Sequence, residues 1–156
     1  MRILILNGPN LNMLGIREPA IYGKQDYHAL EAYCREACRE LGESIPGGID
    51  CEIYQSNHEG DLVDRIQQAY FDRVDGIVIN PAAYTHTSVA IMDALKAVSI
   101  PAVEVHLSNI DEREEFRHIS YAGKACVKSY MGYGFEGYKK AVGYLVSRAA
   151  APCKDR

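Results

Sequence analysis

Short apolar runs that alternate with segments of helical periodicity constrain the fold of this chain more than any other feature. Each run has the length of a strand, and apolar residues in the segment after it recur at helical spacing. The predicted strands are residues 2–6, 49–55, 76–79, 101–106 and 125–130. Such alternation gives a parallel sheet with helices on both faces and right-handed crossovers. We therefore predict one flavodoxin-like, three-layer α/β domain with a five-stranded parallel sheet in the order 2-1-3-4-5.

The predicted helices begin after polar residues and carry one apolar face. One runs from about residue 61 to 73 and places Tyr70 and Arg73 on its buried side, Arg73 as an edge residue with a buried stem. Another follows the third strand, where Thr87 or Ser88 can cap its first turn. We expect the domain to cover residues 1–149 and the tail, residues 150–156, to be frayed.

Length and charge limit the classes of function. The chain has 156 residues, of which 47% are hydrophobic, enough for a single core. A net charge of −4 gives no basic surface for nucleic acid. The apolar runs are shorter than the roughly 20 residues that a membrane span needs, and the first run reads as a strand rather than a signal peptide. We expect a cytoplasmic protein with neither nucleic acid nor membrane as a partner.

The five cysteines form no Cys-x-x-Cys pair, which together with the missing export signal predicts free thiols in a reducing compartment. Cys34 and Cys38 fall on a helix's apolar stripe, so core packing is favoured over metal binding. The five histidines show no zinc-binding spacing. We therefore expect no metal.

Polar residues gather where the predicted strands end. With the order 2-1-3-4-5, the carboxyl ends of strands one, three and four bring together residues 7–10, 80–86 and 106–108. Ligands of open α/β sheets bind at this edge. A long loop without regular periodicity, about residues 11–25, leaves the first strand and ends where Asp26 can cap a helix. We interpret this loop as a lid.

Several side chains near this edge can carry acid–base chemistry. In the lid, Arg17 lies close to Tyr22 in sequence, and a guanidinium lowers the pKa of a neighbouring phenol, which makes it a better base. Spacing alone favours a plainer interpretation, in which the tyrosine packs the loop and the arginine faces solvent. His106 ends a strand, and on its own it fits a satisfied buried histidine at least as well as a catalytic one. Glu104 lies on the same side of that strand, where it can orient the imidazole for a catalytic role.

Other polar residues are open to two interpretations. Asn80 and Ser108 can simply end strands, or they can bind a polyol or a carboxylate. Arg113 and Arg117 share one face if their segment is helical. They then form either a solvated helix face or a bidentate clamp for a small anion.

Five motifs in order make the chain resemble the type II 3-dehydroquinate dehydratases over nearly its whole length. The resemblance implies reversible anti elimination of water from 3-dehydroquinate through an enolate, which gives 3-dehydroshikimate in the third step of the shikimate pathway. It also implies a hydro-lyase without cofactor or metal. The motifs are residues 7–12, Arg17-Glu18-Pro19 with Tyr22-Gly23, residues 80–88, residues 104–110 and residues 113–117.

The resemblance also implies catalytic roles. Tyr22 is expected to remove the C2 proton, and Arg17 to lower the pKa of Tyr22 and stabilise the enolate. Asn10 is expected to hold a water at the enolate oxygen. His106, oriented by Glu104, is expected to protonate the departing C1 hydroxyl.

Further residues are implied to bind the substrate, and one of them, Asp93, to do so in a neighbouring subunit of a dodecamer built from trimers. Asp93 points away from the apolar stripe of its own helix, in agreement with such a role. The implied substrate-binding residues are Asn80, His86, Asp93, Leu107, Ser108, Arg113 and Arg117.

Two alternatives remain open on the same scaffold. One is a flavodoxin-like module that accepts a phosphoryl group or carries a flavin. Against it, strand one ends in Asn-Gly-Pro-Asn, which is neither an acidic cluster nor a phosphate loop. The other is a lyase with a lysine Schiff base, for which Lys24 is the lysine near the lid.

Overall fold

A five-stranded parallel sheet forms the centre of the fold. The computed structural model describes residues 1–16 and 25–150. Within them the strands have the order β2-β1-β3-β4-β5, and every neighbouring pair is parallel. This confirms the predicted fold class and strand order. The strands are β1 (Arg2–Asn7), β2 (Asp50–Gln55), β3 (Gly76–Asn80), β4 (Ala102–His106) and β5 (Lys128–Met131).

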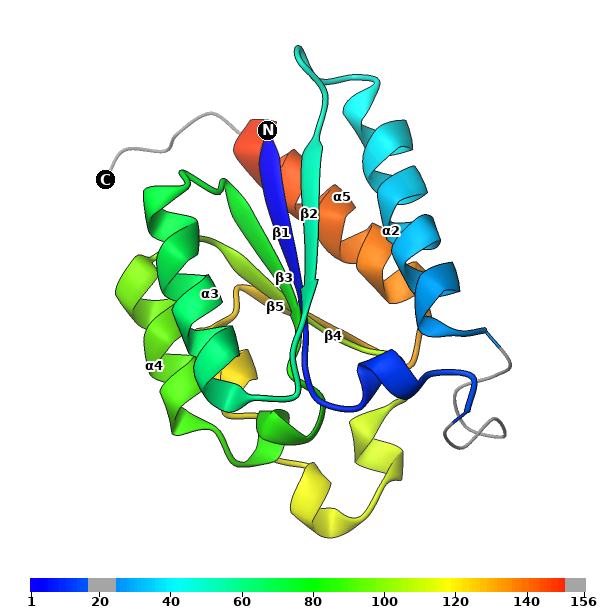
Figure 1. Cartoon of the computed structure of the whole chain (residues 1–156), viewed down its shortest axis with the longest axis vertical. Coiled ribbons are helices and arrows are strands. Elements are labelled where there is room, and N and C mark those ends of the chain that lie inside the picture. Colours follow the sequence, from blue (N-terminus) through cyan, green and yellow to red (C-terminus); the bar gives the residue numbers. More distant parts are fainter. Residues whose placement is uncertain (17–24, 151–156) are drawn as a thin grey trace.

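Helices cover both faces of the sheet (Figure 1). On one face, α2 (Tyr27–Gly42) packs beside α5 (Glu136–Ala150); on the other, α3 (Glu59–Phe71) packs beside α4 (Val89–Val98). Alternate residues of the central strands point to opposite sides, so the sheet separates two apolar cores. No helix in the described part of the chain is long and apolar enough to cross a membrane.

Sequence-coded caps set the starts of two helices. The Asp26 carboxylate accepts a hydrogen bond from the Ala29 N–H, and the Ser88 hydroxyl accepts one from the Ile91 N–H, as predicted for these positions. Cys34 and Cys38 lie in the core with 1% of their surface exposed, which confirms the packing interpretation. Both are free thiols.

The predicted end of α3 was wrong. The helix covers Glu59–Phe71 rather than 61–73, and Tyr70 is 61% exposed instead of buried. Arg73 lies beyond the helix with φ +56°, so the chain turns away there. The apolar periodicity continues past the last helical turn, and hence it could not mark the end of the helix.

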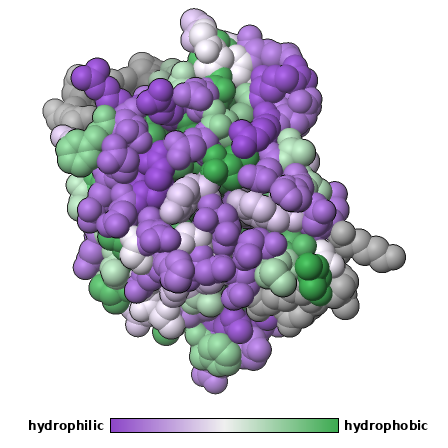
Figure 2. All heavy atoms as spheres, viewed as in Figure 1, coloured by the Kyte–Doolittle hydropathy of each residue, from purple (hydrophilic) through white to green (hydrophobic). Residues whose placement is uncertain are grey.

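Figure 2 shows that hydrophilic residues cover most of the face seen in Figure 1, with apolar residues in smaller areas.

The fifth strand begins later than predicted. Residues 122–125 form a short 3₁₀ helix, η5 (Ala122–Ala125), and β5 starts only at Lys128. Among residues 1–16 and 25–150, four further 3₁₀ helices lie near the carboxyl edge, and two of them occupy the segment 111–117, which is therefore not a single helix. They are η1 (Leu11–Met13), η2 (Ala82–His86), η3 (Ile110–Glu112) and η4 (Glu115–Arg117). α5 continues through Ala150, one residue into the expected tail.

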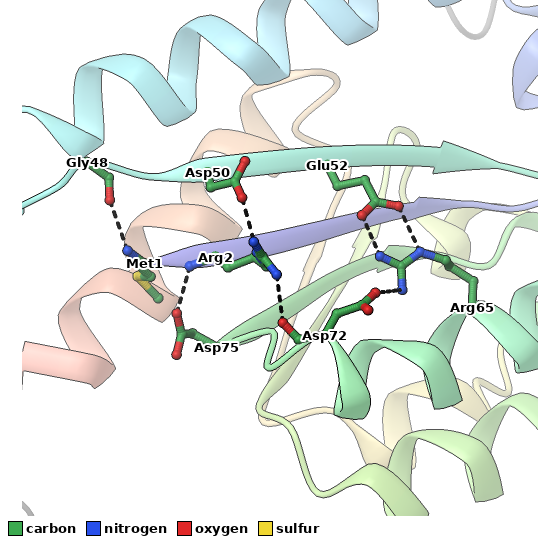
Figure 3. A network of polar contacts seen from close by, with 8 residues as sticks. All are labelled: Met1, Arg2, Gly48, Asp50, Glu52, Arg65, Asp72 and Asp75. Carbon is green, nitrogen blue, oxygen red and sulfur yellow. Dashed lines mark hydrogen bonds and ion pairs between the residues drawn. The ribbon is translucent and has the colours of Figure 1, made fainter.

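Charged groups fix the amino edge of the sheet, opposite the strand ends discussed below (Figure 3). The Arg2 guanidinium lies 3.1 Å from the Asp50 carboxylate and donates to the Asp72 carbonyl at 2.7 Å. The Arg2 N–H donates to the Asp75 carboxylate at 2.7 Å. These contacts join β1 to the first residue of β2 and to the segment before β3. Because the groups are exposed, each pair contributes about 0–1 kcal/mol.

Gly8 allows the chain after β1 to approach the chain after β3 closely. Its N–H donates to the Asn80 carbonyl at 2.8 Å. A Cβ at this position would lie 2.4 Å from the Pro81 carbonyl oxygen and 2.6 Å from the Pro81 carbonyl carbon. Both contacts are with backbone, so a side chain can be accommodated only if the two loops separate.

Gly8→Ala is expected to lower the free energy of unfolding by about 1–3 kcal/mol, because overpacking against backbone costs this much. The thermal midpoint should fall by about 2–4 °C for each kcal/mol. Gly60→Ala is the matched control, since a Cβ there meets nothing within 4 Å and the residue lies in α3. Thermal melts followed by circular dichroism measure both variants. An unchanged midpoint in Gly8→Ala would show that the loops separate without cost.

Candidate active site

A pocket opens at the carboxyl edge of the sheet, where the loops after β1, β3 and β4 meet. In Figure 1 these loops lie at the lower end of the sheet. The pocket combines amide, imidazole, hydroxyl and guanidinium groups, which suits a small, polar, anionic ligand. Of the residues predicted to form the site, eight contribute to its wall: Asn10, Asn80, His86, His106, Leu107, Ser108, Arg113 and Arg117.

Glu104 stands behind His106 as predicted from their positions on β4. The carboxylate is fully buried, and its Oε1 lies 3.0 Å from Nε2 of His106. The pair is at ion-pair distance without hydrogen-bond geometry, and with Nε2 beside the carboxylate the other nitrogen, Nδ1, remains available for proton exchange with a ligand. The pair therefore has the arrangement of a carboxylate-oriented general acid.

Two serine hydroxyls complete the surroundings of Glu104, and sequence reasoning missed both. Ser120 donates to Oε1 at 2.5 Å, and Ser129 donates to Oε2 at 2.9 Å. Burial by itself would raise the pKa of Glu104, but the contacts with His106 and the two hydroxyls outweigh it and hold that pKa below its ordinary value. Glu104 is thus an ionised partner for His106. Neither serine lies in a motif, so no signal in the sequence marked them.

His86 reaches the pocket from η2 with a defined tautomer. Its Nδ1 lies 2.9 Å from the Ile119 carbonyl oxygen. Because a carbonyl only accepts, Nδ1 carries the proton, and in the neutral ring Nε2 is an acceptor. Desolvation lowers the pKa of His86, which favours the neutral ring. His86 can therefore accept a hydrogen bond from a ligand hydroxyl.

Asn80 is held in one orientation by a buried tyrosine on the last helix. Tyr138, on α5, donates to Oδ1 of Asn7 at 2.7 Å and accepts from Nδ2 of Asn80 at 3.0 Å. The Asn80 Oδ1 accepts from the Ala82 N–H at 3.2 Å. This leaves the second N–H of the Asn80 amide for a ligand. The one available signal was that a tyrosine on a buried stripe needs a hydrogen-bond partner for its hydroxyl.

Asn10 lies at the exposed rim of the pocket, in the left-handed region with φ +65°. Its backbone N–H donates to the Asn57 side chain at 2.9 Å, and the Asn57 carbonyl accepts from the Tyr84 hydroxyl at 2.8 Å. Asn57, in the turn after β2, therefore connects the loops that carry Asn10 and His86. Sequence reasoning missed Asn57, because nothing in the spacing of that turn indicates a contact with the loop after β1.

The two arginines reach the pocket from separate 3₁₀ turns and not from one helix. Arg113 directly follows η3, and Arg117 ends η4. The Arg117 Nε lies 2.8 Å from the Glu114 carboxylate, and the Arg113 Nε lies 3.7 Å from it. Glu114 thus holds both guanidinium groups beside the pocket, where they supply positive charge for an anion.

Four predicted site residues remain, and one of them, Glu104, lies behind the pocket wall as described above. Asp93 is exposed on α4 and does not line the pocket. Arg17 and Tyr22 lie outside the described residues, as does most of the expected lid. The start of that loop is anchored, because Leu11 and Leu14 are buried. Within residues 1–16 and 25–150, no three His, Cys, Asp or Glu side chains are arranged to hold a metal ion.

The fold and the pocket define a class of protein, namely a doubly wound α/β protein with an acid–base site at the carboxyl edge of a parallel sheet. Comparison with known families narrows this class. The model of the family described as "Dehydroquinase class II" matches residues 1–146. The chain belongs to this family, and the resemblance seen in the sequence is confirmed.

Individual relatives agree with the family match. A "3-dehydroquinate dehydratase" of Clostridium perfringens is 50% identical over 148 residues, which cover 95% of this chain and 99% of the relative. A type II dehydroquinase from Butyrivibrio crossotus is 53% identical with a TM-score of 0.87, covering 93% of this chain and 97% of that one. One from Propionibacterium acnes is 44% identical with a TM-score of 0.85, covering 94% and 96%.

Proposed function

We propose that this protein is a type II 3-dehydroquinate dehydratase, a hydro-lyase of the shikimate pathway. The observation that carries the proposal is the His106–Glu104 pair at a polar pocket, in a chain that belongs to the class II dehydroquinase family. Tyr22 takes a proton from C2 of 3-dehydroquinate. The resulting enolate then expels the C1 hydroxyl, to which His106 gives a proton, and water leaves.

Each step of this reaction has a protein group assigned to it. Arg17 lowers the pKa of Tyr22 and stabilises the enolate charge, and Asn10 holds a water at the enolate oxygen. Preorganised donors at such an oxygen matter, since loss of one costs about 10²–10³ in rate. Glu104 orients His106. No step requires a metal or an organic cofactor.

The pocket wall supplies groups for the rest of the substrate. Asn80 offers an amide N–H and His86 an acceptor nitrogen to hydroxyl groups, with Ser108 and the backbone of Leu107 beside them. Arg117 binds the carboxylate, and Arg113 closes over it with the lid. Two guanidinium groups beside one pocket support this assignment, because bidentate arginine contacts suit carboxylates.

We further propose that the enzyme is cytoplasmic. We also propose that it assembles as a dodecamer built from trimers, in which Asp93 reaches the active site of a neighbouring subunit. Its exposed position on α4, outside its own pocket, supports this role. Sedimentation velocity combined with activity measurements tests the assembly. A fully active monomer would eliminate it.

The function is tested by adding 3-dehydroquinate to EDTA-treated protein and following the ultraviolet absorbance of the conjugated enone product. We expect turnover that EDTA does not reduce. Turnover that disappears with EDTA and returns with a divalent metal would contradict the metal-free scheme. No turnover under either condition would favour the binding-module alternative, for which flavin absorbance and phosphoryl uptake are the next measurements.

A further inference from the structure

Both oxygens of the Glu104 carboxylate accept hydrogen bonds from hydroxyls that lie outside the pocket wall. Ser129 comes from the neighbouring strand β5, and Ser120 from the segment between η4 and η5. Glu104 itself has no exposed surface, so water does not compete for these bonds. The hydroxyls therefore determine how the carboxylate is solvated.

The direction of the Ser120 hydrogen bond is fixed by the backbone. The Ser120 oxygen accepts the N–H of Gly123 at 2.8 Å, and its own proton is then directed to Glu104. A hydroxyl that donates to a carboxyl oxygen stabilises the ionised form. Gly123 is required for this arrangement, since a Cβ there would lie 2.5 Å from Oε2 of Glu104 and 2.9 Å from the Ser120 oxygen.

Charged and titratable groups face Glu104 from several elements. His106 lies on the same strand, and Glu104 acts electrostatically on His86 of η2, which in turn is influenced by Arg117 of η4. Cys126, between η5 and β5, is also near: burial, followed by the charge of Glu104, raises its pKa to about 12. Ser120 and Ser129, by contrast, are neutral, and each donates a hydrogen bond directly to the carboxylate.

We propose that Ser120 and Ser129 are positioning residues that keep the Glu104 carboxylate ionised and in one orientation, so that it orients His106 for proton transfer. This inference rests on the proposed function and extends its site by two residues. It also assigns β5 a role at the site, because that strand contributes one of the two hydroxyls.

The test compares Ser120→Ala, Ser129→Ala and the double variant with wild type. Losing a donor raises the pKa of Glu104, so the acid limb of log kcat against pH should move to higher pH. A hydrogen bond to a charged group contributes enough for a displacement of about one pH unit per hydroxyl, more in the double variant. KM should change little, because neither serine lines the pocket.

Two control variants separate this role from packing. Ser129→Thr keeps a hydroxyl at the same position and should keep the acid limb of wild type. Ser147→Ala removes an exposed hydroxyl on α5 that donates to the Gly143 carbonyl, and should change nothing. Thermal melts verify that each variant folds. If Ser120→Ala does not fold, the acid limb of Ser129→Ala, on the edge strand, is the test of the proposal.

A second readout does not depend on turnover. In protein labelled with ¹³C at glutamate carboxyls, the Glu104 resonance, identified by its loss in Glu104→Gln, should titrate at higher pH in the serine variants. Movement of this titration supports the inference even if 3-dehydroquinate is not the substrate. An unmoved titration and acid limb in folded variants, or a fall in kcat equal at every pH, would overturn it.

Discussion

Tyr22→Phe should lower kcat by about 10²–10⁴, because it removes the group proposed to take the C2 proton and leaves the ring in place. KM should change much less, since the phenol hydroxyl acts on a proton that moves only in the reaction. Steady-state kinetics followed by the absorbance of the enone product measure both constants. The size of the effect reflects the weak acidity of a proton beside a ketone.

Tyr144→Phe is the matched control for this substitution. Tyr144 lies on α5, partly buried against the core on the α2 side and away from the pocket. It should keep wild-type kinetics. Retained turnover in Tyr22→Phe would move the base to an imidazole of the pocket, His86 or His106. Borohydride trapping with substrate at Lys24 would instead indicate a Schiff-base mechanism.

Glu104→Gln should lower kcat by about 10²–10³ and also reduce stability by about 1–3 kcal/mol. The amide has nearly the shape of the carboxylate but no charge for His106. It also presents an NH₂ group where a carboxyl oxygen accepts a hydroxyl, so a donor meets Ser120, Ser129 or His106 at short distance. Kinetics and thermal melts, carried out on the same preparation, measure the two effects.

The control for Glu104→Gln is Glu36→Gln. Glu36 lies on the exposed side of α2, where it pairs with Arg39 at 2.7 Å. Solvent screens this pair, so its loss should change neither the thermal midpoint nor kcat measurably. A fully active Glu104→Gln variant would remove the proposed orienting role from Glu104. Such a result would also contradict the positioning role proposed for Ser120 and Ser129, because their hydroxyls act through this carboxylate.

Much of the fold could be predicted because its signals are local. The apolar strands and the stripe that includes Cys34 report the two-sided sheet directly, and the caps at Asp26 and Ser88 follow from side-chain chemistry within one helical turn. Errors appeared where periodicity persists beyond an element. The end of α3 at Phe71 and the late start of β5 at Lys128 are of this kind.

The candidate site was predictable to a similar extent. Strand order and the position of residues at strand ends sufficed to bring His86, His106 and Asn80 to one pocket. Spacing raised Arg17 and Tyr22 only as the less favoured interpretation, and family motifs assigned their roles; both lie outside the described residues.

The sequence by itself determined the layered fold, the edge at which the pocket forms and the polar residues that line it, because each depends on the spacing of neighbouring residues. Only the tertiary structure decided which groups hold those residues in place. Tyr138 bonds to Asn7 across 131 positions, and Ser129 bonds to Glu104 across 25. Hydrogen bonds need partners within about 3 Å. Packing of distant segments against the sheet sets such distances, and no local pattern encodes them.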